Sequence, residues 1–114
     1  MRVTLPLICA TSSNTFYFAP LVPCYLKGAN WVANANQAST RSVVIALSGG
    51  STICSGSVSA TLGTPVEGTM TTTEAYLKQA ITKTTPLSIV INLTGSSAAT
   101  VLVDLELDEF KATV

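Results

Sequence analysis

Apolar and polar residues alternate along the C-terminal part of this chain, and this alternation constrains the fold more than any other feature of the sequence. Between residues 100 and 108 every second side chain is apolar, at Val101, Val103, Leu105 and Leu107. Residues 87–94 repeat the pattern with Leu87, Ile89, Ile91 and Leu93. A period of two is that of a β-strand with one buried face. A short loop with a glycine separates the two segments, so we expect them to pair as a β-hairpin.

A second pair of segments flanks a tight turn. Residues 41–47 place Val43, Ile45 and Leu47 on one face, and residues 52–60 return as a serine-rich strand. Between them, the Ser-Gly-Gly-Ser sequence of residues 48–51 supplies glycines for the positive φ angles of a hairpin turn. We therefore expect a second β-hairpin. The polar character of its second strand predicts an edge position or a cover by another subunit.

The remaining strands are shorter. Residues 2–9 form a strand, and Pro6 places it at a sheet edge because proline cannot donate a backbone hydrogen bond to a ladder. Residues 16–18, 25–26 and 66–70 are also expected to be extended.

Two segments are ambiguous and could be helical. Residues 71–74 resemble a capping box, and Glu74 and Lys78 stand at helical spacing, which together support a short helix over residues 72–80. Residues 29–36 could form one or two helical turns.

The sum is an all-β chain of seven to eight short antiparallel strands, with at most one or two short helical turns. Its length of 114 residues fits one domain over residues 1–114. Short strands separated by glycine and proline are typical of a β-sandwich or barrel. We favour a small sandwich of the jelly-roll type, with two packed four-stranded sheets.

Charge is scarce in this sequence. Only 11% of the residues are charged, six basic and six acidic, against roughly 25% in ordinary soluble domains. A small domain has much surface, so surface that lacks charge is expected to be covered by a partner. Zero net charge argues against nucleic acid, which requires a basic patch. No run of 18 apolar residues exists, so we expect no membrane-spanning helix.

Catalytic motifs are absent from the sequence. The chain has no histidine, which excludes Ser–His–Asp, Cys–His and histidine-based metal catalysis. Two carboxylates could still hydrolyse a glycoside, but only Glu67 and Glu74 lie outside the C-terminal cluster of acids, and Glu67 is expected in a solvated loop. We expect no enzyme activity, no cofactor, no metal and no small-molecule substrate.

Three cysteines, Cys9, Cys24 and Cys54, share no metal-binding spacing. A zinc site would need all three thiolates and a carboxylate, so buried free thiols in a reducing compartment are the simpler expectation. The first ten residues are too short for a secretion leader and carry Ile8 where a small residue is needed, so we expect a strand there instead.

The densest polar feature is an acidic strip of four residues, Asp104, Glu106, Asp108 and Glu109. The first three stand two residues apart, so they project from one face of a strand. Such a strip could dock Arg or Lys of a neighbouring subunit, or hold a divalent cation weakly. The alternative is an outward face that aids solubility. Arg2 and the N-terminal strand are a second candidate contact element.

Aromatic residues offer a further possibility. Trp31, Tyr17 and Tyr25, with Tyr76, could form a platform on which a sugar ring stacks, although core packing is the commoner role of isolated aromatic residues in a small domain.

Three segments carry a resemblance to a known family. They are residues 68–73 (Gly-Thr-Met-Thr-Thr-Thr), residues 81–87 (Ile-Thr-Lys-Thr-Thr-Pro-Leu) and residues 101–107 (Val-Leu-Val-Asp-Leu-Glu-Leu). Over residues 29–110 the chain resembles the short jelly-roll cement or decoration proteins on the heads of tailed bacteriophages. The resemblance implies a structural virion protein, made in the host cytoplasm, that forms a homotrimer and binds the major capsid protein on the capsid surface.

Two alternatives remain open. A carbohydrate-binding adhesion or tail module of a phage or bacterial surface would use the aromatic platform. A secreted surface protein would require cleavage after Ala10.

Overall fold

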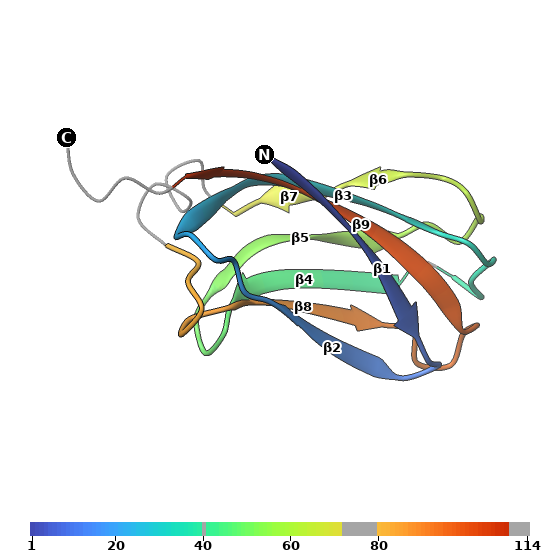
Figure 1. Ribbon diagram of the computed structural model, residues 1–114. Coiled ribbons are helices and arrows are strands. Elements are labelled where there is room, and N and C mark those ends of the chain that lie inside the picture. The colour runs from blue at the N-terminus through green and yellow to red at the C-terminus, as the bar shows by residue number, and fades with distance from the viewer. Residues whose placement is uncertain (40, 72–79, 110–114) are drawn as a thin grey trace.

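The computed structural model describes residues 1–39, 41–71 and 80–109, which form two antiparallel β-sheets packed face to face (Figure 1). Sheet A contains, in spatial order, β1 (Arg2–Cys9), β9 (Ala99–Glu109), β3 (Cys24–Ala33) and β6 (Val66–Glu67). Sheet B contains β2 (Ser13–Phe18), β8 (Leu87–Asn92), β4 (Arg41–Leu47), β5 (Thr52–Val58) and β7 (Thr69–Met70). None of the described residues is helical, and correspondingly none belongs to a helix that could cross a membrane.

The strand pairing is that of a jelly roll. Early strands pair with later strands in reverse order: β1 with β9, β2 with β8, β3 with β6 and β4 with β5. One long antiparallel hairpin is in this way rolled into two sheets, and the rolling brings β3 beside β9 and β4 beside β8. The expected all-β jelly-roll sandwich is therefore confirmed, with the two-residue strand β7 added beside β5.

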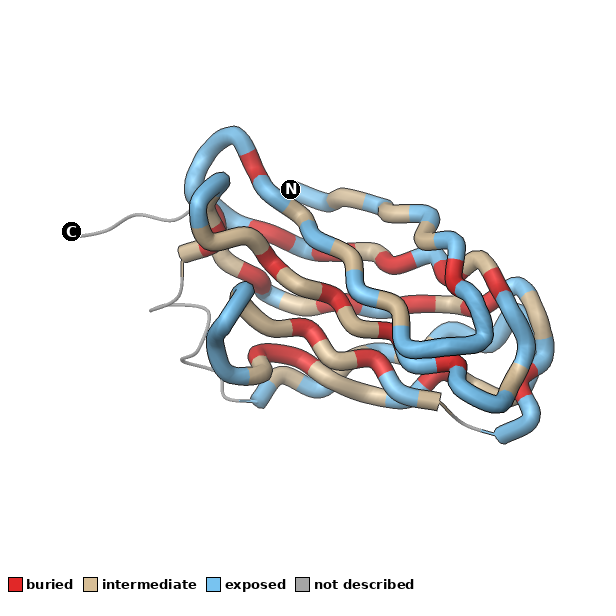
Figure 2. Tube along the Cα trace, turned by 90° about the horizontal axis from the view of Figure 1, so that it is seen from below, coloured by how far each residue is buried: buried red, intermediate tan, exposed pale blue. Residues whose placement is uncertain are grey.

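The core lies between the two sheets and follows the predicted alternation. In β9 the buried side chains are Val101, Val103, Leu105 and Leu107, and their neighbours along the strand are exposed or half-buried. Sheet B supplies Val43, Ile45, Ile89 and Ile91, all with no exposed surface. Figure 2 shows buried and accessible residues alternating along the strands.

One predicted hairpin is confirmed and the other is wrong. β4 and β5 pair directly, with Gly49 at a φ of 76° in the turn between them. In contrast, β8 lies in sheet B and β9 in sheet A, so these consecutive strands face one another across the core. Alternation shows that each strand has one buried face. It does not show whether two such faces lie in one sheet or oppose each other in two.

The shorter segments were predicted with mixed success. Pro6 lies in β1, which is an edge strand of sheet A as expected. Residues 66–70 are extended, as β6 and β7. The ambiguous residues 29–36 do not form helical turns, because β3 continues to Ala33 with Ala29, Trp31 and Ala33 all buried on one side. The helix expected at residues 72–80 falls almost wholly on residues 72–79, outside the described residues.

Candidate functional site

The acidic strip lies on a central strand, on the outer face of sheet A. β9 runs between β1 and β3, and Asp104, Glu106 and Asp108 all point away from the core. Glu109 ends the strand opposite Cys24 and belongs to the alternate set of residues, although it is exposed because it lies at the end of the sheet. The strip therefore consists of three acids on one face and a fourth at its end.

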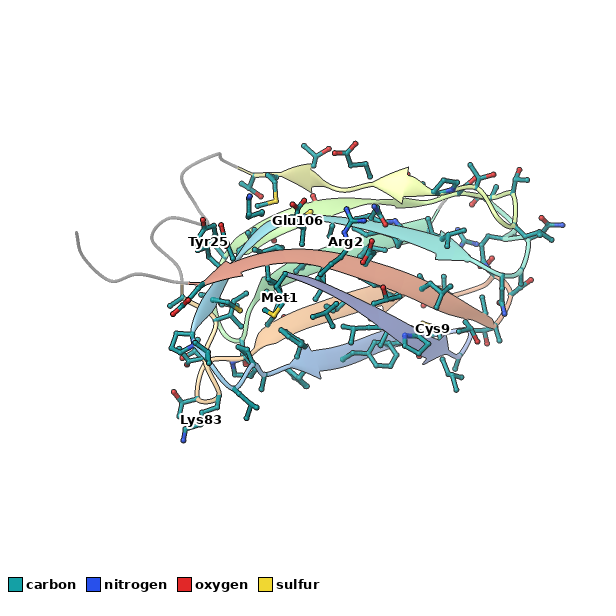
Figure 3. All side chains as sticks on the ribbon, turned by 45° about the horizontal axis from the view of Figure 1, so that its top comes forward. Met1, Arg2, Cys9, Tyr25, Lys83 and Glu106 are labelled. Atoms are coloured by element: carbon teal, nitrogen blue, oxygen red, sulfur yellow. The ribbon has the colours of Figure 1, made fainter. Side chains whose placement is uncertain are left out.

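Arg2 and the acidic strip come together, as two parts of one surface. Arg2 is the register partner of Glu106, and its Nε lies 3.7 Å from Oδ2 of Asp104 (Figure 3). The hydroxyl of Thr4 donates to Oδ1 of Asp104 at 3.2 Å. Because Arg2 is 67% exposed, this ion pair contributes less than about 1 kcal/mol and mainly orients the two side chains.

The end of the strip is held by residues of β3. The Tyr25 hydroxyl donates to Oδ2 of Asp108 at 3.1 Å, and Nζ of Lys27 lies 3.9 Å from the same oxygen. At the N-terminus, the Met1 amino group donates to the Leu107 carbonyl at 2.9 Å. These contacts hold the chain start and β3 against β9 along the charged part of the face.

A polar hollow of about 250 Å³ opens beside Glu106. It forms because the residue opposite Glu106 on β3 is Gly28, at a β-bulge that follows Leu26, and a glycine leaves the space above it empty. Asn30 and Glu67 complete its rim with Arg2 and Asp104. Within residues 1–39, 41–71 and 80–109, no three Asp, Glu or Cys side chains are grouped closely enough to hold a metal ion.

The other half of the same outer face is apolar. Pro6, Leu102 and Val32 are register partners across three strands, and Leu102 is 43% exposed. Leu62 joins Val32 and Leu102 around a hollow of about 380 Å³, and Ile8, 80% exposed, lies one row further along β1. We call these five residues the apolar half and the region of Arg2 and the acidic strip the charged half.

The apolar half was missed at the level of sequence, although the signal was present. Leu102 is one of the residues of the last strand that alternation directs outward. Pro6 and Ile8 are likewise among the outward-facing residues of the first strand. These residues come together because β1 and β3 flank β9 in sheet A. The expected hairpin paired β9 with β8 instead, so it gave no reason to place them side by side.

The predicted aromatic platform is not formed. Trp31 is 1% exposed, its indole N–H donates to the Ser57 carbonyl at 2.8 Å, and its ring lies against Gly56 and Gly68. Tyr17 is 65% exposed but belongs to sheet B, whereas Tyr25 lies on sheet A beside Asp108. Because Trp31 fills the core, it has no free face on which a sugar could stack.

The three cysteines are buried free thiols, as expected. Burial raises the pKa of Cys9 to about 11. Burial, with the negative charge of Glu67 as a smaller cause, raises the pKa of Cys54 to about 11. The pKa of Cys24 is also raised by burial. A thiol with a raised pKa is a weak nucleophile at neutral pH, so these side chains serve as small apolar groups.

No protein-family model matches this chain, and no similar protein was found among curated proteins or solved structures.

Proposed function

We propose that this chain is a structural binding protein that docks through the outer face of sheet A. In its specific form, the proposal is a capsid decoration or cement protein that binds the major capsid protein on the virion surface and stabilises the shell. The observation that carries it is the division of one outer face into a charged half and an apolar half.

This division provides two complementary contributions to binding. Covering Leu102, Ile8 and Leu62 would remove apolar surface from water, and full burial of such a side chain contributes about 1.5–3 kcal/mol. The charged half would set orientation and increase the association rate through complementary basic groups on the partner.

The rest of the chain suits a scaffold rather than a catalyst. The described side chains offer no histidine and no activated thiol. The resemblance of residues 68–73, 81–87 and 101–107 to phage decoration proteins supports the capsid form of the proposal. The carbohydrate-binding alternative is less well supported, because Trp31, the central residue of its platform, is buried in the core.

Co-sedimentation tests the proposal. The purified chain is mixed with shells of a tailed-bacteriophage major capsid protein that were assembled without it. We expect the wild-type chain to sediment with the shells and to raise their disruption temperature. Leu102→Asp places a charge in the apolar half and is expected to weaken binding by about tenfold or more. Glu106→Lys reverses one charge of the charged half and should weaken it as well.

Ser57→Lys is the matched control, because Ser57 is exposed on sheet B and lies far from the docking face. It should bind like the wild type. Failure of the wild-type chain to sediment with the shells would overturn the capsid proposal, and unchanged binding of Leu102→Asp would overturn the assignment of the face. Retention on immobilised glycans that is lost in Tyr17→Ala would favour a carbohydrate-binding module instead.

A further inference from the structure

The sandwich leaves four strands at sheet edges, and they are unequally protected. Sheet A ends in β1 and β6, and sheet B ends in β2 and β7. An edge strand exposes unpaired N–H and C=O groups, and proteins normally protect it with short length, proline, charge or a bulge. β6 and β7 are two residues long. The longer strands behind them, β3 and β5, are partly occupied by other bonds: Cys24 of β3 exchanges two backbone hydrogen bonds with Ile81, and the Ser57 carbonyl of β5 accepts the Trp31 indole N–H. The longest open edges among the described residues are therefore those of β1 and β2.

The hydrogen bonds show which backbone groups of β2 point to its open edge. The Leu93 N–H donates to the Ser12 carbonyl at 2.9 Å, and the register continues without a shift through β2 and β8. In an antiparallel pair alternate residues bond to the neighbouring strand and the residues between them point the other way. Ser13, Thr15 and Tyr17 therefore direct their N–H and C=O groups away from β8, to a side on which none of the described residues forms a further strand (Figure 1).

The same alternation of backbone hydrogen bonds along β1 shows that its open edge is protected. The Leu107 N–H donates to the Met1 carbonyl at 2.8 Å, so the even-numbered residues of β1 face its open edge. Among them, Pro6 has no N–H and stands in the middle of the strand, and Arg2 places a charge near its start. β2, in contrast, contains no proline, glycine or charged residue, and its pairing with β8 has no bulge.

We propose that β2 is the self-association edge of this protein, where β2 of a second copy adds in antiparallel orientation about a two-fold axis. Because only Ser13, Thr15 and Tyr17 offer backbone groups, the pairing must place these residues opposite one another. Centring it on Thr15 uses all three: Thr15 faces Thr15 of the partner subunit, and Tyr17 faces the partner subunit's Ser13. Each facing pair exchanges two backbone hydrogen bonds, and the two sheets B become one continuous sheet.

A second copy is the occupant because its edge is complementary to this one. A two-fold contact uses the same patch on both subunits, so it needs only the β2 edge. A cyclic trimer would need a different edge to receive β2, and in the described part of the chain those edges are blocked by Pro6 or are two residues long. The two-fold contact therefore replaces the trimer that the family resemblance implies.

Side chains favour the same pairing. Facing threonines on neighbouring strands stabilise a sheet, and no like charges meet because β2 has none. The outward residues of β2 and β8, next to the seam of the dimer, are also uncharged: Ser13, Thr15, Tyr17, Ser88, Val90 and Asn92. Phe16 and Phe18, half-buried against the core, would gain cover at the seam.

Measurement of molar mass by light scattering, with size separation at high micromolar concentration, tests this proposal. The wild-type chain should have twice the chain mass of 11.8 kDa. Thr15→Pro removes an N–H that has no bond within the subunit, so it should give a folded monomer with an unchanged circular dichroism spectrum. Ile8→Pro makes the same change at the open edge of β1 and should remain dimeric.

A pair of oppositely charged variants gives a second, independent test of the association. Thr15→Lys and Thr15→Glu each place like charges opposite each other and should be monomeric, and an equimolar mixture should recover a heterodimer, detected by native mass spectrometry. Ser57→Lys, with the same charge added elsewhere on sheet B, should remain dimeric. A monomeric or trimeric wild type would overturn the proposal, as would dimers of Thr15→Lys alone. These results are independent of docking by sheet A, because the two surfaces lie on different sheets.

Discussion

At the scale of single residues, the contact of Trp31 with two glycines determines how β3 meets β5 and the β6–β7 turn. Its indole N–H donates a hydrogen bond to the Ser57 carbonyl, and its ring occupies the space that side chains at positions 56 and 68 would need. A methyl group at Gly56 would lie 2.8 Å from the ring, and one at Gly68 would meet both the ring and the Cys54 sulfur. The absence of side chains at these glycines is therefore a packing requirement.

We predict that Gly68→Ala destabilises the fold by about 1–3 kcal/mol, because the added methyl group must displace the Trp31 ring or Cys54. Gly28→Ala is the matched control, since a methyl group there meets no atom within 4 Å, and it should change the stability by less than about 0.5 kcal/mol. Urea denaturation followed by Trp31 fluorescence measures both. Equal losses of stability in the two variants would show that a methyl group at position 68 does not collide with the Trp31 ring or Cys54.

The buried thiols make stability depend on pH in the alkaline range. Below pH 9 both the folded and the unfolded chain keep the thiol protons, and the stabilisation is fully present. Above pH 9 the unfolded chain releases them, whereas Cys9 and Cys54 hold them until about pH 11 in the fold. We predict that the free energy of unfolding falls as the pH rises from 9 to 11.

A variant with Cys9→Ala and Cys54→Ala provides the control for this prediction. Other groups titrate in the same window, so the informative quantity is the difference in slope between the wild type and the variant in urea denaturation. The variant should lose stability less steeply with pH. A variant with the same slope as the wild type would exclude the two thiols as the cause.

At the scale of elements, the sequence was sufficient to predict which residues face the core and insufficient to predict which strands pair. Val101 to Leu107 and Val43 to Ile45 were placed correctly because burial of one strand face leaves a local, period-two pattern. The β4–β5 hairpin was predictable because Gly49 lies in its turn. β8 and β9 carry equally clear patterns, but their pairing depends on long-range contacts with β2, β4, β1 and β3.

The candidate site shows the same division. The outward direction of Asp104, Glu106 and Asp108 followed from alternation, and Arg2 was a candidate for the same role. The proximity of Arg2 to Asp104, and of Leu62 to Leu102, arises only when the sheet order is known. For Trp31 the sequence left both a core position and a surface platform open, because a single aromatic residue carries no pattern that separates the two, and the structure places it in the core.

At the scale of the whole molecule, the absence of histidine determines how the net charge responds to pH. The six acids and six bases cancel at neutral pH, and no side chain of ordinary pKa titrates between the carboxylates and the thiols. The net charge therefore stays near zero over a broad interval around the isoelectric point of about 6.1. Repulsion between molecules is weak throughout that interval, because the net charge of each molecule is near zero.

We predict a broad plateau of low solubility between about pH 5.5 and 7, instead of a sharp minimum at one pH, because too few groups titrate there to restore a net charge. Precipitation assays across this range measure it. Ser42→Lys combined with Ser57→Lys adds two charges to exposed positions on sheet B and should raise solubility over the whole plateau. A sharp minimum near the isoelectric point would contradict the prediction. Low solubility that persists in the double variant would instead point to the apolar half of sheet A as the surface through which molecules aggregate, because Leu102 and Ile8 remain exposed there.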